Sequence, residues 1–154
     1  MDDRGGTAEL RTADDTIALG AALGRGLRAG DVVVLSGPLG AGKTVLAKGI
    51  AQAMDVEGPV ISPTFVLARV HRARQPGAPA MVHVDLYRLL DQASVDLLDE
   101  LDSLDLDTDL DDAVVVVEWG EGVAERLSDH HLDIRLERAA DTDTRTAIWQ
   151  WSTP

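Results

Sequence analysis

The sequence predicts a single α/β domain, in which helices flank a mostly parallel central sheet that includes some antiparallel strands. Residues 32–35 and 113–117 are short, continuously apolar and rich in valine, which is typical of strands buried on both faces. Helical patterns alternate with the strand patterns, as in α/β proteins. The 154 residues fit one domain spanning 1–154. We expect residues 1–9 to be flexible.

The expected elements follow one another without an internal repeat or a linker that would divide domains. Apolar residues at helical spacing and the composition of the extended runs place them. Helices are expected over 14–28, 44–54, 92–104 and 120–127. Strands are expected over 32–35, 60–70, 80–84, 113–117, 131–137 and 145–151, with a turn over 75–79.

The net charge of −13 comes largely from one segment. Residues 91–112 hold ten acidic side chains and no basic one, and the rest of the chain has 17 acidic against 14 basic residues. This balance does not indicate a basic face for gripping nucleic acid. The acidic segment is either a solvated surface or a docking surface for a basic partner.

The composition also indicates where in the cell we expect the protein to be. No apolar run approaches the length of a membrane span, so we expect no membrane association. The polar, acidic first residues do not resemble a signal peptide, and the absence of cysteine excludes disulfides and thiolate metal sites. We therefore expect a cytoplasmic protein.

A glycine-rich loop is the strongest motif. It reads Gly37-Pro38-Leu39-Gly40-Ala41-Gly42-Lys43-Thr44, between a predicted strand and a predicted helix. This is the P-loop pattern, in which backbone N–H groups and a helix N-terminus surround phosphates. Lys43 supplies a positive charge for the β- and γ-phosphates, and Thr44 supplies a hydroxyl ligand for Mg²⁺. The loop predicts that a nucleoside triphosphate binds over residues 37–45, with Val45 in the first turn of the helix.

Two acidic residues stand where a P-loop protein needs a carboxylate. Asp85 and Glu118 are each the first acid after an apolar strand, and ligands bind beyond the carboxyl ends of such strands. One of them would hold the metal and the other would position the attacking water, and the sequence leaves open which does which.

Aromatic and basic residues give weaker signals. Trp119 follows Glu118, where either adenine stacking or core packing is plausible. Trp149 and Trp151 alternate on the last strand and are interpreted as structural. His83 is interpreted as a buried, hydrogen-bonded histidine. A basic cluster near the turn is either a solvated loop or a contact to RNA or an acidic partner; it consists of Arg69, His71, Arg72 and Arg74.

Four motifs in order carry a family resemblance. After the glycine-rich loop come Ser62-Pro63-Thr64-Phe65, then His83-Val84-Asp85-Leu86-Tyr87-Arg88-Leu89, then Val117-Glu118-Trp119. The set resembles the TsaE family, bacterial ATPases of tRNA threonylcarbamoyladenosine biosynthesis, over roughly residues 10–150. Pro38, where many relatives have Asp, and Gly120, where relatives often have Pro, depart from the pattern.

The resemblance implies a mechanism and partners. It implies that ATP and Mg²⁺ are the cofactors and that hydrolysis is slow without partners. The partners are the TsaB and TsaD proteins, which modify the adenosine beside the anticodon, so tRNA is met only through that complex. Thr44 and Glu118 would be Mg²⁺ ligands, and Asp85 a catalytic or metal-shell acid. Thr64 would lie near the γ-phosphate, with Trp119 and Thr12 against the nucleotide.

Other classes of P-loop protein require residues that can be looked for in this sequence. A small GTPase is excluded because the chain has no asparagine, and neither of its two lysines, Lys43 and Lys48, is followed two residues later by Asp. A small-molecule kinase is the alternative enzyme, with Arg69, Arg72 and Arg74 as candidates for a lid. A nucleotide-gated interaction module is the third hypothesis, since no arginine finger is evident.

Overall fold

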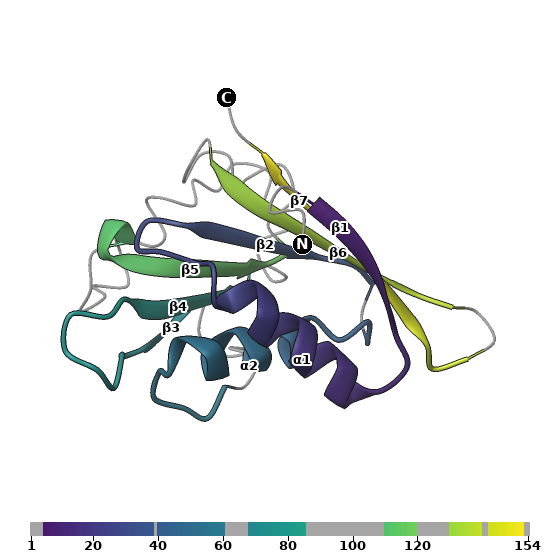
Figure 1. The fold of residues 1–154 in the computed structure, drawn as a ribbon, viewed down its shortest axis with the longest axis horizontal. Coiled ribbons are helices and arrows are strands. Elements are labelled where there is room, and N and C mark those ends of the chain that lie inside the picture. The colour runs from purple at the N-terminus through teal and green to yellow at the C-terminus, as the bar shows by residue number, and fades with distance from the viewer. Residues whose placement is uncertain are drawn as a thin grey trace.

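The described residues form one seven-stranded sheet with two α-helices packed against it (Figure 1). The computed structural model describes residues 5–38, 40–60, 68–85, 110–119, 130–139 and 142–152. The helices are α1 (Ala13–Gly24) and α2 (Lys43–Met54), with a 3₁₀ turn, η2, at Leu110–Asp112. The strands are β1 (Gly5–Leu10), β2 (Val32–Ser36), β3 (Ala68–His71), β4 (Ala80–Asp85), β5 (Ala113–Glu118), β6 (His131–Arg138) and β7 (Arg145–Ser152).

The strand order is β1-β7-β6-β2-β5-β4-β3. The four central strands β6, β2, β5 and β4 are mutually parallel, and the outer strands β3, β7 and β1 pair antiparallel. This confirms the predicted α/β class with a mostly parallel centre. Because β2, β5 and β4 are parallel neighbours, their carboxyl ends meet at one edge.

Both helices lie on the same face of the sheet (Figure 1). They approach closely because glycines meet where they cross: a Cβ on Gly20 would lie 2.3 Å from the Leu46 carbonyl oxygen, and one on Gly49 would lie 2.2 Å from the Ile17 carbonyl oxygen. The apolar side of α2 packs Leu46 and Ile50 into a core that includes Val33 and Val116. The opposite sheet face carries a second apolar cluster around Val34, Val82 and Val115. The central strands are therefore apolar on both faces, as their continuous valine runs predict.

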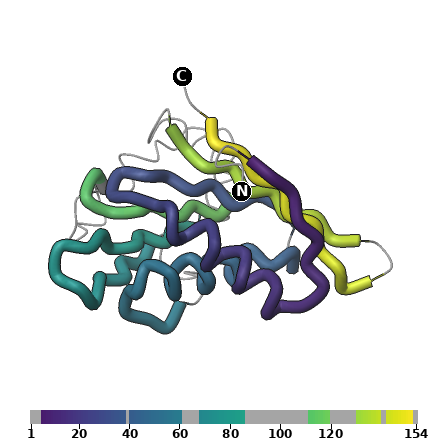
Figure 2. The backbone as a smooth tube through the Cα atoms, in the orientation of Figure 1, coloured from purple at the N-terminus to yellow at the C-terminus, as the bar shows by residue number. Residues whose placement is uncertain are grey.

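The first strand differs from the expectation of a flexible stretch over residues 1–9. Gly5–Leu10 pairs along its length with β7, and the two strands run side by side (Figure 2). Gly6 allows this pairing because a Cβ there would lie 2.5 Å from the Trp149 ring. Local sequence did not reveal the strand because its partner is at the far end of the chain.

Most other boundaries are close to the expected ones, with one correction. Helix α1 ends at Gly24 rather than at residue 28, because the chain tightens into three-residue turns and the Asp31 carboxylate accepts a hydrogen bond from the Arg28 backbone N–H at 2.7 Å. The expected helices over 92–104 and 120–127 lie outside the described residues, as does the 61–67 part of the expected strand 60–70. Trp149 and Trp151 pack against the core, as expected.

Candidate functional site

The glycine-rich loop leaves the carboxyl end of β2 and turns directly into α2. Gly37, Gly40 and Gly42 all have positive φ, at 142°, 78° and 104°. Gly37 also passes so close to β6 that a Cβ there would lie 2.4 Å from the Leu136 carbonyl oxygen. These positions require glycine, and the backbone they shape presents N–H groups around the N-terminus of α2, where an anion is favoured.

The Lys43 side chain is folded into this loop. The residue is 5% exposed, and its Nζ donates to the Gly37 carbonyl oxygen at 2.5 Å and to that of Pro38 at 3.5 Å. The ammonium also lies over the Trp119 ring, 3.3 Å from the ring centroid. Trp119 reaches it from the end of β5 with an unusual left-handed backbone, φ 65°. The aromatic ring and the loop carbonyls thus hold the positive charge beside the backbone of the glycine-rich loop.

Thr44 and Glu118 meet at the mouth of the loop. The Thr44 hydroxyl lies 3.2 Å from both carboxylate oxygens of Glu118. The Nε2 atom of His83, on β4, lies 2.6 Å from Oε2 of the same carboxylate. Glu118 is only 3% exposed, so it is a buried acid held by two side chains. These contacts confirm that His83 is buried and hydrogen-bonded.

Asp85 lies next to Glu118 on the neighbouring strand. The two residues are register partners in the parallel pair β4–β5, and strand alternation puts both on the α2 side of the sheet. Within the described residues no group of three or more His, Cys, Asp or Glu side chains gathers as a protein-only metal cage. The oxygen donors Thr44 and Glu118 fit Mg²⁺, which is usually held by one or two protein ligands together with phosphates and water.

A hollow of about 320 Å³ adjoins the loop at Ala41 and Gly42. It lies between the start of α1 and the β6–β7 hairpin, and its lining includes Thr12, Gly42 and Val45, three of the residues predicted to contact the nucleotide. Arg11 and Arg145 also line it, and Arg145 donates to the Gly40 carbonyl oxygen at 3.0 Å. Sequence reasoning missed Arg145 because an arginine at the start of a strand carries no motif.

The predicted site residues therefore divide into three groups. Thr44, Asp85 and Glu118 converge at the sheet edge, and Lys43 and Trp119 lie beside the loop. Thr12 and Val45 line the hollow, whereas Trp119 is not among its lining residues. Leu39 and Thr64 lie outside the described residues.

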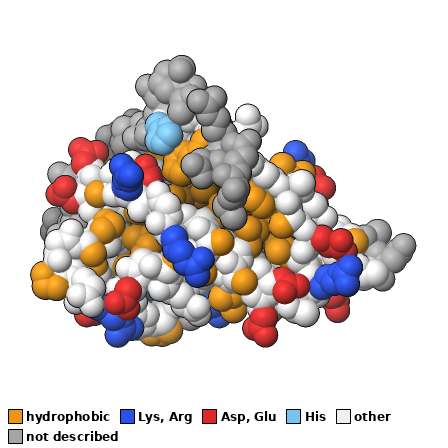
Figure 3. All heavy atoms as spheres, viewed as in Figure 1, with side chains coloured by type: hydrophobic (Ala, Val, Ile, Leu, Met, Phe, Trp, Pro, Cys, Tyr) orange, Lys and Arg blue, Asp and Glu red, His pale blue; other side chains and the backbone are white. Residues whose placement is uncertain are grey.

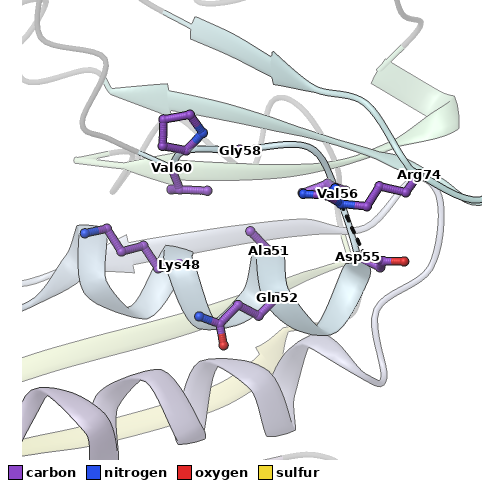
Figure 4. A pocket seen from close by; sticks show the side chains of 9 residues that line it. Lys48, Ala51, Gln52, Asp55, Val56, Gly58, Val60 and Arg74 are labelled. Carbon is purple, nitrogen blue, oxygen red and sulfur yellow. Dashed lines mark ion pairs between the residues drawn. The ribbon is translucent and has the colours of Figure 1, made fainter.

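A larger groove of about 590 Å³ lies over the second half of α2 (Figure 4). Lys48 and Gln52 of α2 line one side, and Arg74 pairs with Asp55 at 3.4 Å near the end of the helix. The buried residues Ala51, Val56 and Val60 also line it. No predicted phosphate- or metal-binding residue lines this groove, so its size does not make it the site.

The basic cluster near the turn is largely exposed. Arg69, Arg72 and Arg74 are exposed, whereas His71 is buried and its Nδ1 lies 2.8 Å from the Glu57 carbonyl oxygen. Burial lowers the pKa of His71 below its ordinary 6.5, against the opposing effect of that hydrogen bond. His71 therefore ties the segment after α2 to β3.

The surface shows no preference for one charge on the face seen in Figure 3. Among the described residues drawn there, acidic and basic side chains are interspersed. No helix among the described residues is long and apolar enough to cross a bilayer.

The sheet order and the glycine-rich loop define a P-loop NTPase-like domain. The family model described as "Threonylcarbamoyl adenosine biosynthesis protein TsaE" matches residues 10–147. The chain belongs to the TsaE family.

Individual relatives agree with this assignment. The tRNA threonylcarbamoyladenosine biosynthesis protein TsaE of Mycobacterium tuberculosis is 76% identical over 147 residues, which cover 96% of this chain and 88% of the relative. The protein of the same name from Bacillus subtilis is 34% identical over 122 residues, covering 77% and 71%. The crystal structure of Bacillus subtilis YdiB matches with a TM-score of 0.72 at 26% identity, covering 98% of this chain and 87% of that one.

Proposed function

We propose that this protein is a Mg²⁺-dependent ATPase that acts in the threonylcarbamoyladenosine modification of tRNA beside the anticodon. The observation that carries the proposal is the contact between Thr44 and Glu118 at the mouth of the glycine-rich loop. It puts two hard oxygen donors beside a backbone anion cradle and a buried lysine, which is the set of groups that phosphoryl transfer from a nucleotide requires. Names shared by relatives at up to 76% identity support the tRNA pathway.

The bound ATP would extend from the loop into the adjoining hollow. Its phosphates would lie against the amides of residues 37–44, and the nucleoside would enter the hollow lined by Thr12, Val45 and Arg145. The volume of about 320 Å³ is at the lower end of the range for small-molecule sites. Trp119, which contacts Lys43, would lie on the phosphate side of the nucleotide.

The residues have distinct roles in converting ATP and water to ADP and phosphate. Lys43 stabilises negative charge on the transferred phosphate. Thr44 and Glu118 would hold Mg²⁺, which neutralises phosphate charge when it is bound. Asp85, beside Glu118, would orient the attacking water or the metal shell. We expect hydrolysis by the protein alone to be slow, as the family resemblance implies.

A partner-dependent cycle fits the expectation that hydrolysis by the protein alone is slow. We propose that the protein acts with the TsaB–TsaD complex, which performs the transfer to adenosine, and that it meets tRNA through that complex. The described residues hold 13 acidic and 11 basic side chains, so they do not carry the excess positive charge of an independent RNA binder.

Reconstitution tests this proposal. Purified protein is assayed for Mg²⁺-dependent phosphate release, first alone and then with TsaB, TsaD, tRNA and a supply of threonylcarbamoyl-adenylate. We expect slow release alone, faster release in the complex, and repeated rounds of tRNA modification only when the protein is present. Multiple-turnover modification that is unchanged on omitting the protein contradicts the pathway role. Partner-free transfer of phosphate to a small acceptor would indicate a kinase instead.

A further inference from the structure

The buried histidine on β4 has one hydrogen-bond partner among the described residues. His83 is 0% exposed, its Nε2 lies 2.6 Å from Glu118 Oε2, and its Nδ1 has no hydrogen-bond partner. A carboxylate only accepts, so Nε2 carries the hydrogen and donates it. Burying an imidazole with one nitrogen unpaired is unfavourable compared with an apolar side chain. The contact with Glu118 is therefore the interaction that distinguishes histidine from leucine at this position.

The two contacts on the carboxylate are unequal. The Thr44 hydroxyl lies at the same 3.2 Å from both oxygens, which is long for a hydroxyl–carboxylate bond. The His83 contact is shorter and involves Oε2 alone. His83 thus anchors Oε2 to the rigid β4–β5 pair and leaves Oε1 with Thr44 as its only partner among the described side chains.

From this geometry we propose that His83 is a positioning residue, which fixes the Glu118 carboxylate through Oε2 so that Oε1 and the Thr44 hydroxyl together receive a divalent cation. The proposal rests on the ATPase function proposed above. It adds a residue that touches neither nucleotide nor metal and that acts on the cation through Glu118. Hydrogen bonds to a ligating carboxylate generally change metal affinity or activity by about 10- to 100-fold.

Variants of His83 separate positioning from packing. His83→Leu keeps the approximate volume and removes the donor, whereas His83→Gln restores an N–H at a similar reach. His131→Leu is the matched control, because His131 is also a buried histidine whose Nε2 lies 3.2 Å from a carboxylate oxygen, that of Asp133 on β6. Circular dichroism first checks that each variant is folded.

The measured quantity is the Mg²⁺ dependence of nucleotide binding. Calorimetry gives the ATP affinity in EDTA and at increasing Mg²⁺, and phosphate release gives the half-saturating Mg²⁺ concentration. For His83→Leu we expect at least a 10-fold higher Mg²⁺ requirement with the ATP affinity in EDTA changed less than twofold. His83→Gln is expected within about threefold of the unmodified protein, and His131→Leu unchanged. An unchanged Mg²⁺ requirement in folded His83→Leu, or an equal loss in EDTA, overturns the proposal.

A measurement on the unmodified protein covers the case in which His83→Leu does not fold. In ¹⁵N-histidine NMR we expect the His83 hydrogen on Nε2, with its resonance shifting when Mg²⁺ and a non-hydrolysable ATP analogue are added together but not with the analogue alone. A hydrogen on Nδ1, or no Mg²⁺-dependent shift, overturns the positioning role. If the unmodified protein neither binds nor hydrolyses ATP with Mg²⁺, it is the ATPase proposal itself that fails.

Discussion

Helix α2 carries the only two lysines of the chain, five residues apart and in opposite surroundings. Lys43 in the first turn is buried and bonded to loop carbonyls beneath Trp119. Lys48 is exposed and lines the groove, where the nearby charges of Asp55 and Arg74 form an ion pair that is more than half exposed. A buried, fixed charge interacts more strongly with a ligand than a solvated one does. The N-terminal end of α2 is therefore the better place for binding a charged ligand, although the larger hollow lies at the other end.

Replacing each lysine gives the largest expected difference between the two ends. Lys43→Ala removes the charge proposed to stabilise the transferred phosphate, and we expect ATP hydrolysis to fall by about 10²- to 10³-fold with weaker ATP binding. Lys48→Ala is expected to leave both within about twofold. Phosphate release and calorimetry measure the two effects. Wild-type hydrolysis by Lys43→Ala would contradict the placement of the site.

The next largest effect is expected on stability, at the crossing of α1 and α2. In Gly49→Ala the new Cβ would meet the Ile17 carbonyl oxygen at 2.2 Å. Alanine gains about 1 kcal/mol of helix propensity, but the backbone of α1 cannot move aside without separating the helices. We expect a net loss of about 1–3 kcal/mol in urea unfolding. Gly26→Ala is the control, because its nearest contact would be 3.8 Å away. Equal stabilities would show that the crossing tolerates a methyl group.

A smaller effect is expected from the N-terminal cap of α1, at the edge of the hollow beside the glycine-rich loop. Thr12 accepts a hydrogen bond from the Asp15 backbone N–H at 3.1 Å, and the Asp15 carboxylate accepts one from the Thr12 N–H at 3.2 Å. Thr12→Ala should lower the free energy of unfolding by about 1 kcal/mol, and Thr12→Ser should retain most of it. Chemical denaturation compares the three proteins. A loss of ATP affinity in Thr12→Ala without any loss of stability would indicate direct contact with the nucleotide.

The smallest expected effect is the contribution of His71, near the groove over α2, to the pH dependence of stability. Burial lowers the pKa of His71 in the folded protein below 6.5, so the unfolded chain binds more protons between the two pKa values. Stability therefore rises with pH through this window and falls as the pH drops below about 6.5. His71→Gln should flatten that dependence, which urea unfolding at a series of pH values measures. An unchanged slope would mean that other groups cause it.

The sequence predicted those parts of the fold that depend on residues close together in the chain. The valine runs predicted β2 and β5, and the glycines with Lys43 predicted a tight loop between β2 and α2, because buried strands and such loops require those residue types wherever they occur. Strand β1 was not predicted, because its partner is distant in sequence and its glycines are typical of a flexible terminus. The contact of Arg145 with Gly40 and the contact of Trp119 with Lys43 depend on tertiary packing, which spacing does not encode.

Strand β1 has β7 as its neighbour in the sheet, and among the described strands these two are the farthest apart in sequence. During synthesis on the ribosome, β1 must therefore wait for this partner until β7 has emerged. A pairing between such distant segments is slow to form, because the loop that it closes is nearly as long as the chain. Chain termination before β7 would consequently leave β1 without its partner in the sheet.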